Sequence, residues 1–124
     1  MFKNLIFIFI GGGLGSSLRY IISKYLNNTN YLIPYGTLTV NILGSLILGL
    51  VLGWAIKHEN LNNGMVVFLS VGLCGGFTTF SSFAFENLSL LKSGDYVQFL
   101  IYTFGSVLLG LLAVFSGTLL AKFI

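Results

Sequence analysis

Four long apolar stretches dominate this sequence and restrict the folds that it can adopt. They cover about residues 5–26, 31–56, 61–91 and 96–121, with short polar segments between them. Each is at least as long as the roughly 20 residues with which a helix crosses a bilayer. The sequence therefore predicts an all-α membrane protein, a single domain over residues 1–124 whose four transmembrane helices leave both termini on one side.

The charge content excludes several classes of function. Only 7% of the 124 residues are charged and the mean hydropathy is +0.95, whereas soluble domains carry roughly 25% charged residues. A net charge of +3 without a Lys/Arg cluster argues against a nucleic-acid partner. One cysteine and one histidine provide neither a disulfide nor a zinc site. We therefore expect a protein of the lipid bilayer that is not an enzyme.

The third stretch is too long for one helix. At 1.5 Å per residue, residues 61–91 would extend about 46 Å, against a hydrocarbon core of roughly 30 Å. Residues 72–83 combine paired glycines with Ser and Thr, which weaken a helix. We expect an unwound segment here, with a new helix starting near Thr79, in a place sheltered from lipid. The alternative is a kinked helix whose Ser and Thr side chains bond back to it.

Uncharged polar side chains also lie at membrane depth. Asn41 is in the middle of the second stretch and must point inward, either as an interhelical hydrogen bond or as part of a ligand site. Tyr102, Ser106 and Gly110 are four residues apart, so they share one helix face and predict a narrow hydroxyl-bearing track.

Two ionisable residues are expected inside the hydrophobic zone, at a cost of about 2.5 to 3.5 kcal/mol each at mid-bilayer. Arg19 either serves a function there or extends to the interface. Glu86 either pairs with Arg19 or caps a pore mouth. Phe80 and Phe83 are neighbours on the half-helix after the break, where ring edges can meet an anion; their ordinary alternative is lipid or core packing.

The basic residues give the chain no preferred orientation. Three lie on the terminal side and three at or near the other side: Lys3, Lys57 and Lys122 against Lys24, Lys92 and Arg19. Either a partner directs insertion, or both orientations insert and pair as an antiparallel homodimer. Small residues four apart allow close helix contact, between copies or within one chain. These are Gly11/Gly15, Ser45/Gly49/Gly53, Gly72/Gly76 and Ser106/Gly110.

Three segments together resemble one known family. Residues 12–20 (GGLGSSLRY), 36–44 (GTLTVNILG) and 75–83 (GGFTTFSSF) are similar to the signatures of the small dual-topology fluoride channels, the CrcB/Fluc family. The resemblance covers essentially the whole chain. It implies passive export of fluoride from the cytoplasm, across the plasma membrane, through two pores of an antiparallel homodimer.

The resemblance also implies roles for individual residues. A structural sodium ion at the dimer centre would bind the backbone carbonyls of Gly75 and Thr78. The fluoride path would be formed by Asn41, Phe80 and Phe83, with Ser81 and Ser82 near the dimer core, Tyr102 and Ser106 in the polar track, and Arg19 toward the vestibule. Gly110 departs from the family, since relatives carry a hydroxyl at this third track position.

Two other classes of protein compete with this hypothesis. A small four-helix drug/proton antiporter needs a membrane-embedded carboxylate, for which Glu86 is the only candidate. A non-transporting interaction subunit would leave the glycine-rich break without a use.

Overall fold

The computed structural model describes all residues from 1 to 124 and is entirely helical. Four segments are long and apolar enough to cross a membrane, which confirms the prediction of four spans. The first, second and fourth spans are the single helices α1 (Phe2–Leu26), α2 (Tyr35–Lys57) and α6 (Tyr96–Ala121). The third span consists of α3 (Gly64–Val67), the π-helical segment η1 (Phe68–Cys74), α4 (Gly75–Phe77) and α5 (Ser81–Lys92).

Local signals in the sequence explain where the helices begin and end. Pro34 directly precedes α2, a position where the missing N–H of proline costs no helical hydrogen bond. The side chain of Asn63 accepts a hydrogen bond from the Met65 amide and so caps α3. Gly94, with φ of 78°, follows α5 and reverses the chain toward α6. These signals separate the third span from its neighbours.

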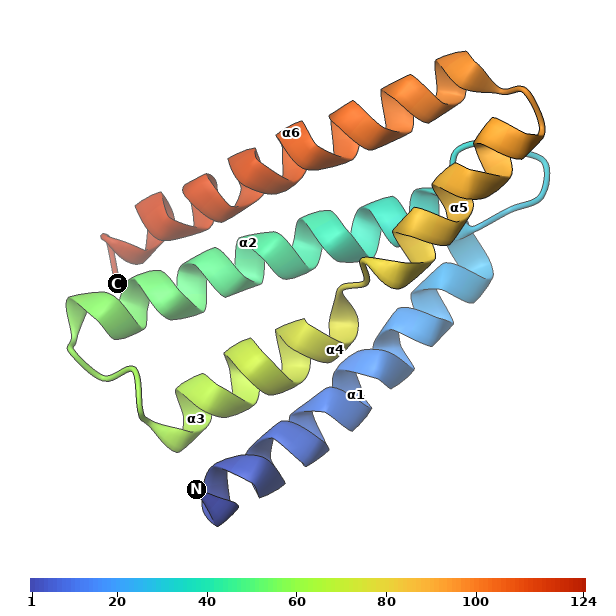
Figure 1. The fold of residues 1–124 in the computed structure, drawn as a ribbon. Helices are drawn as coiled ribbons and strands as arrows, with labels where there is room; N and C mark the ends of the chain where they lie inside the picture. The colour runs from blue at the N-terminus through green and yellow to red at the C-terminus, as the bar shows by residue number, and fades with distance from the viewer.

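The helices are arranged as two long pairs (Figure 1). Helix α2 lies along α6, and α1 lies along the first half of the third span. Helix α5 contacts the N-terminal part of α6. Both termini lie at the end that also carries the α2–α3 connection, as four membrane crossings require. The α1–α2 and α5–α6 connections lie together at the opposite end, called here the α1–α2 end.

The close approach of α1 to the third span depends on glycines. A Cβ on Gly76 would lie 2.5 Å from the Gly12 carbonyl oxygen, and one on Gly11 would lie 2.6 Å from the Phe68 carbonyl oxygen. Gly49 and Gly117 play the same part between α2 and α6. The glycines of the predicted sets on α1, α2 and the third span therefore serve packing within one chain, whereas Ser45, Ser106 and Gly110 line a groove described below.

The break in the third span is shorter than the sequence predicts. Residues Gly72 to Phe77 remain helical, and only Thr78 to Phe80 leave the helix before α5 starts at Ser81. Gly75 and Gly76 do not unwind the chain, because Gly76 is packed against the backbone of α1. The expected interruption is confirmed, but Thr78, which is extended at φ −86° and ψ 160°, marks its start.

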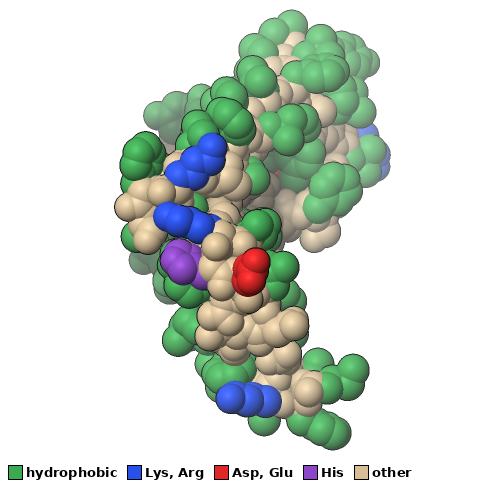
Figure 2. Space-filling view, turned by 90° about the vertical axis from the view of Figure 1, so that its left-hand side faces the viewer, with side chains coloured by type: hydrophobic (Ala, Val, Ile, Leu, Met, Phe, Trp, Pro, Cys, Tyr) green, Lys and Arg blue, Asp and Glu red, His purple; other side chains and the backbone are tan.

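The outer surface is largely apolar. Phe9, Phe104 and Phe115 are all at least 60% exposed on the long helices, as expected where acyl chains surround a protein. Figure 2 looks onto the end that carries the termini, where a few charged side chains lie among tan side chains and backbone, with green apolar side chains around them. The distribution fits a bundle whose ends meet water and whose sides meet lipid.

Candidate functional site

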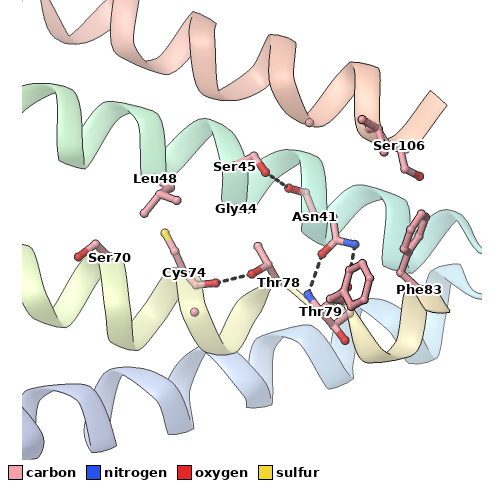
Figure 3. Close-up of a pocket in the computed structure, with 14 residues that line it drawn as sticks. Asn41, Gly44, Ser45, Leu48, Ser70, Cys74, Thr78, Thr79, Phe83 and Ser106 are labelled. Carbon is pink, nitrogen blue, oxygen red and sulfur yellow. Dashed lines mark hydrogen bonds between the residues drawn. The ribbon is translucent and has the colours of Figure 1, made fainter. Parts of the chain in front are cut away.

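Asn41 of α2 binds the unwound segment of the third span. Its amide oxygen accepts the Thr79 N–H at 2.7 Å, and its Nδ2 donates to the Thr79 carbonyl at 3.1 Å (Figure 3). One side chain therefore satisfies both backbone groups of a residue that has left the helix. Because unsatisfied backbone groups are costly at membrane depth, this pair stabilises the break.

At the break, two backbone amides donate to side chains, and this leaves two backbone carbonyls without their regular helical hydrogen bonds. The Thr79 amide donates to Asn41, so it does not return to the Gly75 carbonyl four residues earlier. The Ser82 amide donates to the Thr79 hydroxyl at 3.1 Å, so it does not return to the Thr78 carbonyl. Gly75 and Thr78 are the two residues predicted to hold a cation through their carbonyls. The break thus removes the helical partner of each.

Arg19 contacts the same segment from α1. Its Nε donates to the Gly76 carbonyl at 2.9 Å, and the Ser16 hydroxyl lies at 3.5 Å from the same oxygen. The carboxylate of Glu86 instead accepts hydrogen bonds from Thr37 and Tyr102. The Arg19–Glu86 pair, one of the two alternatives for Glu86, is therefore not formed within the chain, because each group bonds to a polar partner on another helix.

A groove of about 370 Å³ lies between α2, α6 and the broken span. We call it the central groove. Its lining is Asn41, Gly44, Ser45, Leu48, Ser70, Cys74, Gly75, Thr78, Thr79, Phe80, Phe83, Ser106, Val107 and Gly110. This set contains no charged side chain, and the Ser106 hydroxyl is buried without a hydrogen-bond partner in the chain. In Figure 3, Asn41 and Ser45 of α2 are drawn above Thr78 and Thr79 of the broken span.

Aromatic rings continue from this groove toward Tyr102. The ring centroids of Phe80 and Phe83 are 6.1 Å apart, and those of Phe83 and Tyr102 are 5.1 Å apart. Phe80 is 79% exposed in the single chain although it lines the groove, whereas Tyr102 is only 2% exposed. The groove is thus open at Phe80 and closed beyond Phe83.

Most of the residues singled out in the sequence come together here. Those that line the central groove are Asn41, Gly75, Thr78, Phe80, Phe83, Ser106 and Gly110. Ser81 and Ser82 lie beside it in the first turn of α5, and Tyr102 contacts Phe83. Arg19 lies behind the break, on the α1 side.

Sequence reasoning missed Thr37 and Asn27 near Glu86, and it did not predict that Tyr102 bonds to this carboxylate. Thr37 donates to Glu86 Oε2 at 2.6 Å, Tyr102 donates to Oε1 at 2.7 Å, and Asn27 Nδ2 donates to the Thr37 hydroxyl at 3.2 Å. One signal pointed to Thr37, since it lies four residues before Asn41 and shares its face of α2. No local pattern indicated Asn27.

These features define a small multi-pass membrane protein with a polar, uncharged groove beside a broken helix. Residues 6–118 match the family described as CrcB-like protein, Camphor Resistance (CrcB). The chain belongs to this family. Its relatives include proteins named fluoride-specific ion channel FluC, and a bacterial member of such a channel family is a plasma-membrane protein.

Three of these relatives match over nearly the full chain. The FluC protein of Bacteroides fragilis is 47% identical over 124 residues, 97% of each chain. That of Phocaeicola vulgatus is 50% identical over 117 residues, 93% of this chain and 95% of its own. That of Flavobacterium psychrophilum is 43% identical over 124 residues, 97% of this chain and 98% of its own. The predicted resemblance is confirmed.

Proposed function

We propose that this protein is a fluoride-selective channel that lets fluoride leave the cytoplasm passively and so lowers its toxicity. The observation that supports this most is the central groove, where the Asn41 amide, the Ser106 hydroxyl and the rings of Phe80 and Phe83 line a space without fixed charge. The relatives named as fluoride-specific channels support the same function.

The chemistry of the lining suits fluoride. This anion is small and strongly hydrated, so a selective path must replace its water with closely spaced donors, which are stronger at low dielectric. Hydroxyl and amide groups supply donors, and phenyl ring edges carry partial positive charge. A lysine or arginine would hold the anion too firmly for it to leave, and none lines the groove.

The open groove supports an antiparallel homodimer with two pores. A path through lipid must be enclosed, yet Phe80 is 79% exposed in one chain. A second copy packed over this face would enclose the groove. Opposite insertion of the two copies agrees with the balanced basic residues, Lys3, Lys57 and Lys122 against Lys24, Lys92 and Arg19.

A structural sodium ion fits the freed carbonyls. Gly75 and Thr78 each lack the helical amide partner, and carbonyl oxygens of unwound helices are ligands for sodium. Two carbonyls are too few to replace the water around a cation, so the same pair from a second copy would complete the site. The ion would supply the partner that these carbonyl oxygens lack at membrane depth, and it would link the two copies.

Purified protein in liposomes loaded with fluoride tests the function. We expect rapid fluoride release to an electrode and chloride release no faster than from empty vesicles. Equal chloride and fluoride release, or fluoride release at the empty-vesicle rate, contradicts the proposal. The drug/proton antiporter makes the opposite prediction: proton-coupled export of a cationic drug that Glu86→Gln abolishes.

Orientation is tested separately. Reporters that are active only in the cytoplasm or only in the periplasm are fused to the C-terminus, and both types should give signal. Signal from one type alone would contradict the antiparallel dimer while leaving the fluoride measurement valid. Removal of sodium from the liposome buffers should slow fluoride release if the Gly75 and Thr78 carbonyls hold this ion.

A further inference from the structure

A second pocket, of about 230 Å³, is formed by α1, α2 and the broken span, and no residue of α6 lines it. We call it the lateral pocket. The central groove is lined by α2, the broken span and α6, and by no residue of α1, so the two share only Cys74 and open on different sides of the bundle. The lateral pocket is lined by Leu18, Ile22, Leu43, Ile47, Leu73, Cys74 and Phe77.

The lining of the lateral pocket has no group that could hold water or an ion. Every side chain in it is apolar, and the Cys74 thiol behaves as a small hydrophobic group. A water molecule needs two to four polar partners in such a place, whereas apolar cavities stay dry and take up apolar molecules; about 150 Å³ is enough for benzene. The chemistry of the pocket therefore selects an apolar occupant.

The pocket leads from the outer surface into the bundle. Leu18 and Leu43, on its two walls, are 47% and 41% exposed, whereas Cys74 and Phe77 at its floor are 3% and 6% exposed. Acyl chains surround these helices in a bilayer, so they have access to the open side. An unfilled gap would leave the lining without dispersion contacts on one side, in contrast to the close packing of protein interiors.

The depth of the pocket matches one leaflet. Ile22 lies four residues from the end of α1 and Ile47 lies twelve residues from the start of α2, both counted from the α1–α2 end. At 1.5 Å per residue, the pocket extends from about 6 to 18 Å below that end. Each leaflet contributes about 15 Å of hydrocarbon, and the helices project a few ångströms beyond it. The pocket thus lies beside the acyl chains of the leaflet at the α1–α2 end.

The width of the pocket separates a lipid from a second copy of the chain. A helix with its side chains is about 10 to 12 Å across and is too wide to enter a space of this size between α1 and α2. An acyl chain is a single file of methylene groups and can enter from the side. The second copy that would enclose the central groove faces the other side of the bundle.

We propose that the lateral pocket binds one acyl chain of a phospholipid from the leaflet at the α1–α2 end. The chain lies between α1 and α2 and reaches Cys74 and Phe77, the floor of the pocket. Phe77 is the last helical residue before the break at Thr78, and Cys74 also lines the central groove. The lipid therefore completes the packing behind the start of the break, whatever ion the groove conducts.

Photolabelling tests this occupant. A phospholipid with a diazirine midway along one acyl chain is mixed into liposomes that contain the protein, and peptide mass spectrometry locates the labelled residues. We expect Cys74 and Phe77 to carry at least half as much label as Ile21 and Leu108, which are 50% and 59% exposed on the outer surface. A lipid that only passes along the surface would not reach the floor of the pocket.

Two other patterns of label would overturn the proposal. Label on Leu18 and Leu43 without label on Cys74 and Phe77 would mean that no chain enters the pocket. Absence of label from all four residues, with Leu108 labelled, would mean that a second copy of the protein covers this side.

A pocket-filling variant provides the second test. Leu43→Trp adds bulk at the wall, so label on Cys74 and Phe77 should fall at least fivefold while label on Leu108 is unchanged. Leu112→Trp is the matched control, since it adds the same bulk at a position of α6 that is 50% exposed. Equal loss of label in both variants would overturn the assignment to the pocket. If Leu43→Trp does not fold, the label pattern of the unaltered protein decides alone.

Discussion

The two halves of the third span are held to the bundle by opposite means. The first half, α3 to α4, packs against α1 through glycines whose missing side chains let backbones touch. The second half, the break and α5, is held by polar side chains of α2 and α6: Asn41 to Thr79, and Thr37 and Tyr102 to Glu86. The first arrangement depends on shape and the second on hydrogen bonds, so substitutions should affect them differently.

The largest loss of stability should come from adding a methyl group to the first half. In Gly76→Ala the new Cβ would lie 2.5 Å from the Gly12 carbonyl, so α1 must move away. We expect a loss of about 3 kcal/mol, at the upper end of overpacking costs. Thermal unfolding in detergent measures it. Gly13→Ala is the control, since a Cβ there meets nothing within 4 Å, and similar melting of both variants would refute the packing argument.

Removal of the Asn41 amide should be next in size. Asn41→Leu keeps the approximate volume but leaves the Thr79 N–H and C=O without partners. We expect a loss of about 2 kcal/mol and at least a tenfold drop in fluoride efflux. Ser45→Ala is the control for the loss of stability, because the Ser45 hydroxyl only bonds back to the Asn41 carbonyl of its own helix. Efflux retained in Asn41→Leu would show that the break holds its shape without α2.

Arg19→Leu tests whether the first half also depends on a hydrogen bond. It removes the charged donor to the Gly76 carbonyl, for an expected loss of about 1.5 kcal/mol in thermal unfolding. Ser16→Ala should cost less, because its hydroxyl lies 3.5 Å from the same oxygen. A loss in Arg19→Leu greater than in Gly76→Ala would contradict the comparison of the two halves.

The smallest effect should come from the cap of α5. Thr79→Val removes the oxygen that accepts the Ser82 amide, a loss of about 1 kcal/mol. Thr79→Ser should restore the unfolding temperature, since it keeps the acceptor. Failure of Ser to restore it would assign the effect to side-chain shape rather than to capping.

Features that depend on local sequence could be predicted, whereas contacts between distant residues could not. The four spans and the interruption follow from apolar length and from Gly, Ser and Thr in one segment, which are local properties. The inward position of Asn41 followed from its polarity at membrane depth, but its partner did not. Thr79 lies 38 residues away, and only the packing of α2 against the third span brings the two together.

Glu86 shows the limit more clearly. The sequence predicts its position inside the membrane and offers Arg19 as one of two possible roles for it, with a pore mouth as the other. Its partners Thr37 and Tyr102 are 49 and 16 residues away and carry no charge. A hydroxyl in a membrane helix gives no sign of what it bonds to, because it can equally bond back to its own helix, as Ser70 does with Val66.

The π-helical segment η1 determines where the third span can lose a residue. Its wider turns hold one residue more than ordinary helical turns would. Deleting a single residue between Phe68 and Cys74 would let this segment wind as regular α-helix and leave the residues on either side of it facing as before. The same deletion in a regular helix such as α5 would rotate every later residue of that helix by about 100°, so η1 is the part of the third span that should best tolerate the loss of one residue.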